Sequence, residues 1–283
     1  MQSVADLRRA GRRRSAMQSA YRRVLPKVAV VGVGGVGGTV AASLATAGTC
    51  DLTCVTRGIG LDTIRRSGLR VTLHDGEEVN CTNITAVDAR GPVTASVGAQ
   101  DIIFLTTKAH QIAGALDSIA PLVDGRTSIV PLQNGLPWWF FAGRTFRNPP
   151  PTTTLSSIDP GAALFEALPP SQVVGAVGFV AGSTRDEGME RQWFDGKVRG
   201  RRRWFSNWPP ERSIITLGEL EGSSGGSGGG GGGSGSSSAA TQRRAVAVAG
   251  LFTSSRVRLP TRLVDDIHSA VFSKLLVVDN YNL

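Results

Sequence analysis

A glycine-rich hexapeptide, Gly32-Val33-Gly34-Gly35-Val36-Gly37, carries the strongest chemical signal in this 283-residue sequence. A short apolar, β-branched run at residues 28–31 precedes it, and an alanine-rich stretch at residues 40–47 follows it. The motif is weak alone, but a strand, a glycine turn and a helix in this order are the context that dinucleotide binding needs. The three spaced glycines permit a tight turn, a close approach of backbone to pyrophosphate, and close packing of helix on strand. Amides at the helix N-terminus favour bound phosphates. We therefore predict a dinucleotide site rather than a purely structural turn.

The residues that end the second expected strand indicate which dinucleotide is bound. A site for NAD places Asp or Glu there, where the carboxylate binds the ribose 2′-hydroxyl. This sequence has Thr56-Arg57 instead, and Asp51 lies at the other end of that strand. A guanidinium can hold a 2′-phosphate through paired, charge-assisted hydrogen bonds. We predict NADP(H), with an ordinary surface arginine as the alternative interpretation of Arg57.

Two polar triplets, Thr106-Thr107-Lys108 and Gln133-Asn134-Gly135, come directly after apolar runs. Doubly wound sheets bind ligands beyond the carboxyl ends of their strands. A lone lysine after a strand is commonly solvated and an Asn-Gly pair is commonly a turn, so each triplet is weak by itself. Because both share an edge of the sheet with the glycine loop, Lys108 and Asn134 become candidate binding residues.

The alternation of apolar runs with helical patterns predicts the fold that positions these residues. Helices are expected at residues 40–47 and 110–120. The expected strands lie at residues 28–31, 52–55, 101–105, 128–132, 173–180 and 214–217, with a hairpin of 69–73 and 79–84. This βαβ alternation predicts an α/β protein with a doubly wound, mostly parallel Rossmann sheet.

Departures from the alternation predict the organisation of the chain. Residues 1–26 are expected to be a basic leader, either disordered or a transit peptide. Residues 27–262 form the expected NADP-binding domain, interrupted by an insertion at about 195–212 and a flexible Gly/Ser linker at 222–238. The insertion mixes arginines with tryptophans, a pattern that could bind single-stranded nucleic acid, but a solvated insertion is the favoured interpretation. A helix at about 242–252, a strand near residue 257 and a helix from about residue 263 are expected after the linker.

The charge of the chain is concentrated in two segments. The net charge is +9, yet residues 1–25 hold seven arginines with one acid, and residues 196–203 hold five basic residues with no acid. The remainder is slightly acidic, so we expect no nucleic-acid partner. Apolar runs are too short for a membrane span, so we expect no membrane partner. Three cysteines and three histidines show no metal spacing, so we expect no metal site and a reducing compartment.

These motifs together resemble the ketopantoate reductase (2-dehydropantoate 2-reductase) family. The resemblance rests on residues 32–37, Arg57, residues 107–111, 133–139, 159–160, 174–177 and 217–219, and on residues 265–267 and 272–276 near the end of the chain. It covers most of residues 27–283, apart from the insertion and the Gly/Ser linker. It implies NADPH as cofactor and a small 2-oxo acid as substrate.

The resemblance also implies roles for individual residues. Lys274 corresponds to the lysine that donates a proton to the substrate carbonyl, a task that suits an amine with a pKa drawn toward neutrality. The family has asparagines four and eight positions later, where this chain has Val278 and Asn282. Asn282 is therefore a substrate-binding candidate. Lys108 and Asn134 match residues that contact cofactor and substrate, and Ala181 matches a backbone contact to the nicotinamide.

Members of the family continue into a helical second domain that supplies a catalytic carboxylate. This sequence stops inside the helix expected to begin that domain, so residues 263–283 are expected to be the start of a truncated domain. The expected activity is reduction of 2-dehydropantoate to (R)-pantoate, in pantothenate biosynthesis, impaired by the truncation. A catalytically weak NADP-binding remnant and a reductase of another 2-oxo acid are the alternatives. A homodimer, in which a second copy would complete the cleft, is a further alternative. The expected location is the cytoplasm, or an organelle interior if residues 1–26 are a transit peptide.

Overall fold

A computed structural model describes residues 25–90, 97–142, 154–191, 198–220, 243–253 and 255–281. The expected Gly/Ser linker lies outside these ranges, as do Asn282 and the expected leader apart from its last two residues. Within the described ranges, no helix is both long and apolar enough to cross a membrane.

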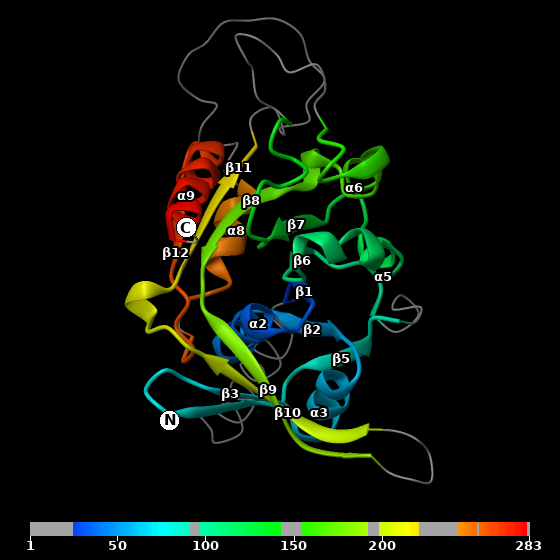
Figure 1. Ribbon diagram of the computed structural model, residues 1–283, viewed down its shortest axis with the longest axis vertical. Coiled ribbons are helices and arrows are strands. Elements are labelled where there is room, and N and C mark those ends of the chain that lie inside the picture. The colour runs from blue at the N-terminus through cyan, green and yellow to red at the C-terminus, as the bar shows by residue number, and fades with distance from the viewer. Residues whose placement is uncertain are drawn as a thin grey trace, which may run out of the picture.

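A five-stranded parallel sheet forms the centre of the protein (Figure 1). Its strands, in spatial order, are β5 (Thr85–Asp88), β2 (Asp51–Thr56), β1 (Lys27–Val31), β6 (Ile102–Leu105) and β7 (Ser128–Pro131). The order reverses at β1, so the carboxyl ends of β1 and β6 open into the crevice where doubly wound sheets bind ligands. The predicted fold class and the predicted strands of this sheet are confirmed.

The two faces of the sheet bury separate sets of side chains, because alternate residues of a strand point to opposite faces. Along β1, Val28 and Val30 join one core, whereas Ala29 and Val31 join the other. Helix α2 (Gly35–Ala47) covers the first face with its apolar side chains. The second face is covered by residues 112–122 and by the aromatic residues 138–140. Burial on both faces explains why the strands read as continuous apolar runs.

Two smaller sheets flank the central one. The first contains β12 (Thr261–Leu263), β11 (Ile214–Glu219) and β8 (Val174–Phe179), and it carries the last helix, α9 (Ile267–Tyr281). The second contains β4 (Glu78–Cys81), β3 (Leu69–Thr72), β10 (Val198–Ser206) and β9 (Gly182–Arg191). Strand β8 leads almost directly into β9, so one long stretch of chain joins the two smaller sheets (Figure 1).

Three short helices complete the described elements. Helix α3 (Ile59–Ser67) follows β2, and α6 (Ala163–Ala167) precedes β8. Helix α8 (Arg243–Gly250) begins where the Glu219 carboxylate accepts hydrogen bonds from the amides of Arg244 and Ala245, at 2.7 and 2.9 Å. This contact ties the start of α8 to the end of β11.

The structure corrects three predicted elements. The helix expected at residues 110–120 is broken into 3-10 turns and a single α-helical turn, α5 (Leu116–Ile119). Gly114 weakens a helix at its centre and Pro121 cannot continue one, which accounts for the break. The strand expected near residue 257 is β12, because Pro260 has no amide to donate and pairing begins after it. The last helix starts at Ile267 rather than near residue 263.

The predicted solvated insertion at about 195–212 is wrong. The segment supplies β10, which pairs antiparallel with β9 and parallel with β3. Trp204 of this strand is fully buried, and its indole Nε1 donates a 3.1 Å hydrogen bond to the Val33 carbonyl in the glycine loop. Arginines of β10 pair with acids on other strands of the same sheet: Arg201 with Glu187, Arg202 with Asp186 and Arg203 with Glu78. Charge in this strand therefore marks cross-strand pairing rather than a solvated loop.

The burial of Trp204 predicts a large loss of stability in the Trp204→Ala variant. Removing a fully buried indole and its hydrogen bond should lower the free energy of unfolding by about 3–5 kcal/mol. The control is Trp208→Ala, since Trp208 is 39% exposed and its removal should change stability by about 0.5 kcal/mol or less. Urea denaturation followed by circular dichroism measures both. Equal, small losses would show that β10 does not pack against the glycine loop.

Candidate functional site

The glycine loop joins β1 to α2 and leaves no room for side chains on its inner side. Gly32 adopts a φ of +94°, and a Cβ there would collide with Thr107. Gly34 differs, because a Cβ on it would meet nothing within 4 Å. The loop is thus pressed against the end of β6 on one side and open on the other. An open backbone face at a helix N-terminus is the shape that accepts a phosphate.

The hairpin of β9 and β10 packs against the first turn of α2, which follows the loop. A Cβ on Gly35 would overlap the Gly182 carbonyl at the start of β9, and a Cβ on Gly38 would overlap the indole of Trp204. Together with the hydrogen bond from Trp204 to Val33, these contacts hold the loop between the central sheet and the hairpin. The sequence motif alone predicts the loop but not the strand that supports it.

A cavity of about 450 Å³ runs along the open side of the loop and the carboxyl ends of β1, β2 and β6. It is lined by most of the predicted cofactor residues, with Arg57 and Lys108 among them. A third cation, Arg202 of β10, lines it as well. Among the described lining residues there is no Asp or Glu. The cavity is therefore suited to an anion.

The end of β6 is bonded directly to the glycine loop. The Thr106 hydroxyl donates to the carbonyls of Val31 and Gly32, at 3.0 and 2.9 Å. Lys108 follows two residues later, exposed at the mouth of the cavity. This geometry explains why the polar triplet after β6 and the glycine motif, more than 70 residues apart in the chain, belong to one site.

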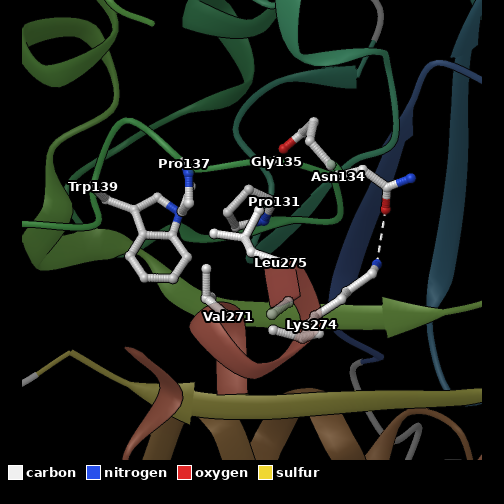
Figure 2. A pocket seen from close by; sticks show the side chains of 11 residues that line it. Pro131, Asn134, Gly135, Pro137, Trp139, Val271, Lys274 and Leu275 are labelled. Atoms are coloured by element: carbon white, nitrogen blue, oxygen red, sulfur yellow. Dashed lines mark hydrogen bonds between the residues drawn. The ribbon is translucent and has the colours of Figure 1, made fainter. Parts of the chain in front are cut away.

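A second, smaller cavity of about 110 Å³ lies between the end of β7 and helix α9 (Figure 2). The Lys274 ammonium donates hydrogen bonds to Asn134 Oδ1 at 2.8 Å and to the Gly178 carbonyl at 2.5 Å. It also lies 5.1 Å from the centroid of the Phe179 ring. Two predicted site residues, 140 positions apart in the chain, thus meet at one edge of this cavity, as Figure 2 shows.

The surroundings of Lys274 set its chemistry. The rest of the cavity wall is largely apolar, with Pro131, Trp139 and Val271 lying across the cavity from the Lys274 ammonium (Figure 2). Burial lowers the pKa of Lys274 below its ordinary value of 10.5, because the charged form loses hydration. An amine that is held by two acceptor oxygens and releases its proton more readily than a surface lysine can act as a general acid.

Asn134 is presented by a turn that the local sequence dictates. Gln133 donates from Nε2 to the Leu105 carbonyl at 2.8 Å, which fixes the triplet against β6. Gly135 has a φ of +93°, so the chain turns away immediately and leaves the amide of Asn134 facing α9. The predicted turn and the predicted binding residue are therefore the same feature.

Two predicted site residues are not placed with the others. Asn282 lies outside the described residues. Ala181 lines neither of the two cavities described above, and its carbonyl accepts a hydrogen bond from the amide of Asn207 at 2.8 Å. Its neighbour Gly182 lines the larger cavity instead. Sequence reasoning missed Arg202 because it lies in the segment expected to be a solvated insertion.

The fold and the site together define a Rossmann-like α/β domain with a glycine loop at the point where the strand order reverses. Residues 28–137 match the sequence model of the family described as ketopantoate reductase PanE/ApbA. A 2-dehydropantoate 2-reductase of Mesorhizobium japonicum is 39% identical over 249 residues. Both similarities agree with the resemblance of the sequence motifs to the ketopantoate reductase family.

The matches cover most of this chain but only part of each relative. The Mesorhizobium protein is matched over 88% of this chain and 63% of its own length. A crystal structure assigned to a ketopantoate reductase from Ralstonia solanacearum is 26% identical, with a TM-score of 0.65, and covers 89% of this chain and 64% of that one. D-mandelate dehydrogenase, in complex with NADH and anilino(oxo)acetate, shares the fold at 17% identity and a TM-score of 0.56, over 88% of this chain and 60% of its own.

The environment of Lys274 predicts its titration. Its ε-amine should lose its proton at a lower pH in the native protein than in the urea-unfolded chain, because only the folded state removes water from the ammonium. Competitive acetylation across a pH series, followed by mass spectrometry of the peptide containing Lys274, measures both midpoints. Coincident midpoints in the native and unfolded chains would contradict the burial argument.

Proposed function

We propose that this chain binds NADPH and carries the residues that reduce a small 2-oxo acid, 2-dehydropantoate, to (R)-pantoate. The observation that supports this most directly is the meeting of Lys274 with Asn134 beside an apolar cavity, on the same side of the sheet as the glycine loop. A proton donor and a nucleotide site at the same edge of a sheet are the two parts that a hydride-transferring reductase needs.

The residues of the larger cavity fit a dinucleotide phosphate. The open face of Gly34 and the first amides of α2 would hold the pyrophosphate, since the first turn of a helix leaves its amides without intrahelical partners. Arg57, at the end of β2, would hold the 2′-phosphate. The absence of a carboxylate among the described lining residues favours NADPH over NADH.

The residues of the chain itself would carry out the proton transfer of the reduction. Bound NADPH would supply the hydride for the carbonyl carbon of the substrate. Lys274 Nζ gives its proton to the carbonyl oxygen as that oxygen gains charge, and the resulting neutral amine takes a proton back from water. Asn134 orients the lysine through its 2.8 Å hydrogen bond and leaves its own NH₂ group free to face a substrate oxygen. The apolar wall of the cavity strengthens these polar contacts by excluding water.

The similarity to a named relative supports 2-dehydropantoate as the substrate more strongly than the shape of the cavity does. The Mesorhizobium relative is named a 2-dehydropantoate 2-reductase, and this chain spans 63% of its length. The cavity of about 110 Å³, lined by one amine and by the side-chain amides of Gln133 and Asn134, has the size and polarity for a short oxo acid.

Replacing Lys274 by Ala should lower kcat for NADPH-dependent reduction of 2-dehydropantoate by about 10²–10⁴-fold, the range that a positioned general acid contributes. The dissociation constant for NADPH should stay unchanged, because Lys274 does not line the cofactor cavity. NADPH oxidation followed at 340 nm gives the rate, and nicotinamide fluorescence gives the affinity. Full activity in Lys274→Ala would place the proton donor on another residue.

Arg57→Ala should weaken NADPH binding by about 1.5–3 kcal/mol, the worth of hydrogen bonds to a charged group, and should leave NADH binding unchanged. The control is Arg66→Ala, which removes an exposed arginine of α3 that does not line the cavity. Titration of nicotinamide fluorescence with both cofactors measures the selectivity. Equal affinity of the unmodified protein for NADH and NADPH would overturn the proposed cofactor.

A second candidate function is NADPH binding with little turnover. It is favoured by the outer face of α9, where Phe272, Leu276 and Val277 are 56, 53 and 43% exposed beside the turn that carries Lys274. Water that reaches this face reduces the benefit of a desolvated proton donor. The rate assay separates the two candidates, since a binding protein would show NADPH affinity without a difference in rate between the unmodified chain and Lys274→Ala.

A further inference from the structure

Among the described residues, three cations line the larger cavity, and Arg202 is the one that lies outside both the sequence motifs and the matched family region. It lies on β10, whereas the family match spans residues 28–137. We propose that Arg202 is a second binding residue for the 2′-phosphate of NADPH, supplied by the β9–β10 hairpin opposite Arg57. This inference rests on the proposed cofactor and adds a residue that determines the preference for it.

The guanidinium of Arg202 is fixed by Asp186, its neighbour on β9. Arg202 Nε donates a hydrogen bond to Asp186 Oδ1 at 2.6 Å, and Arg202 Nη2 donates one to Asp186 Oδ2 at 2.8 Å. A guanidinium has five N–H groups, so this bidentate pair leaves three of them for a ligand. The main chain is fixed too, because the Arg202 amide donates to Thr63 Oγ1 of α3 at 3.0 Å. The group is therefore preorganised, and little side-chain entropy is lost when it binds.

The remaining N–H groups face the end of β2. An added Cβ on Gly60 would lie 3.4 Å from Arg202 Nη1 and 3.4 Å from Thr56 Oγ1, so these two atoms lie no more than twice that distance apart. Thr56, Arg57 and Arg202 all line the one cavity. In this fold the end of the second strand is where the adenine ribose is recognised. Arg202 thus approaches from β10 the position that Arg57 approaches from the end of β2.

The charge balance of the cavity agrees with a doubly charged ligand. Its described lining contains Arg57, Lys108 and Arg202 and no carboxylate. Asp186 stands behind Arg202 and remains ionised, since the Arg202 guanidinium holds the pKa of that carboxyl below its usual range. Asp186 compensates part of the positive charge in the free protein without occupying the face that the ligand would use. A phosphate monoester can then be clamped between two planar guanidinium groups.

Arg201 provides a matched control on the same strand. Its side chain points to the other face of β10 and is 60% exposed. Its Nη2 atom lies 3.7 Å from Oε2 of Glu187. It does not line the cavity. Arg202→Met and Arg201→Met therefore remove the same charge from adjacent residues, and only the first removes it from the proposed phosphate site.

The experiment measures dissociation constants of the two variants and the unmodified protein for NADPH, NADH and adenosine 2′,5′-bisphosphate. Nicotinamide fluorescence serves for the first two ligands and calorimetry for the third. Arg202→Met should weaken NADPH and the bisphosphate by about tenfold or more, as expected for a charge-assisted contact. NADH, which has the pyrophosphate but no 2′-phosphate, should bind within twofold of the unmodified protein. Arg201→Met should leave all three affinities within twofold.

The possible outcomes separate this inference from the proposed function. An unmodified protein without preference for NADPH would overturn the proposed cofactor and, with it, the role of Arg202. A preference for NADPH that Arg202→Met retains in full would overturn the role of Arg202 alone. An equal loss of NADPH and NADH affinity would also overturn it, because the residue would then serve the pyrophosphate or the hairpin. Thermal unfolding of both variants, expected to coincide within a few degrees, identifies a loss caused by misfolding.

Discussion

The close backbone packing around the glycine loop is the constraint on which the rest of the structure depends. Gly32 lies against Thr107 of the neighbouring strand end, Gly35 lies against Gly182, and Gly38 lies against Trp204. A methyl group at any of these positions would push apart elements that also build the two cavities. The central sheet, helix α2 and the β9–β10 hairpin therefore share one junction. The cation-lined cavity exists because this junction is tight on the inside and open at Gly34.

Lys274 and Asn134 form a second junction, of a different kind. It is polar and partly desolvated, and it connects the end of β7 with α9 through a single side chain. The lysine also bonds to the Gly178 carbonyl in β8, so three elements converge on one ammonium. A group with so many fixed partners is held in place before any ligand arrives, which is the property that preorganised sites share.

Much of this arrangement could be predicted from the sequence. The glycine motif, Arg57, Lys108 and Asn134 lie where strand ends and turn signals place them, because the ends of parallel strands meet at one edge. Lys274, on helix α9, was indicated only by the resemblance of its motif to the family. The β10 strand could not be predicted in the same way. Its arginines read as solvated until the register with β9 shows Arg202 opposite Asp186. Cross-strand pairing is a property of two segments, and a single-sequence pattern contains only one of them at a time.

The helix expected at residues 110–120 failed for a local reason that the sequence did contain. Gly114 lies in the middle of that apolar period and Pro121 stands at its end, and together they leave only one α-helical turn. The apolar residues still reach the core: Ile112 and Ile119 are both buried. The periodic pattern therefore predicted which side chains are buried better than it predicted the backbone that carries them.

The hydrogen bond between Trp204 and Val33 joins positions 171 residues apart, and the contact between Arg203 and Thr72 joins positions 131 residues apart. Contacts of such long sequence separation form late, because closing a long loop costs chain entropy before the contact returns any energy. The glycine loop is made early during synthesis, at the amino end of the domain, yet its supporting strand follows far behind. The cavity beside the glycine loop should therefore take its final form only after β10 has docked, late in folding.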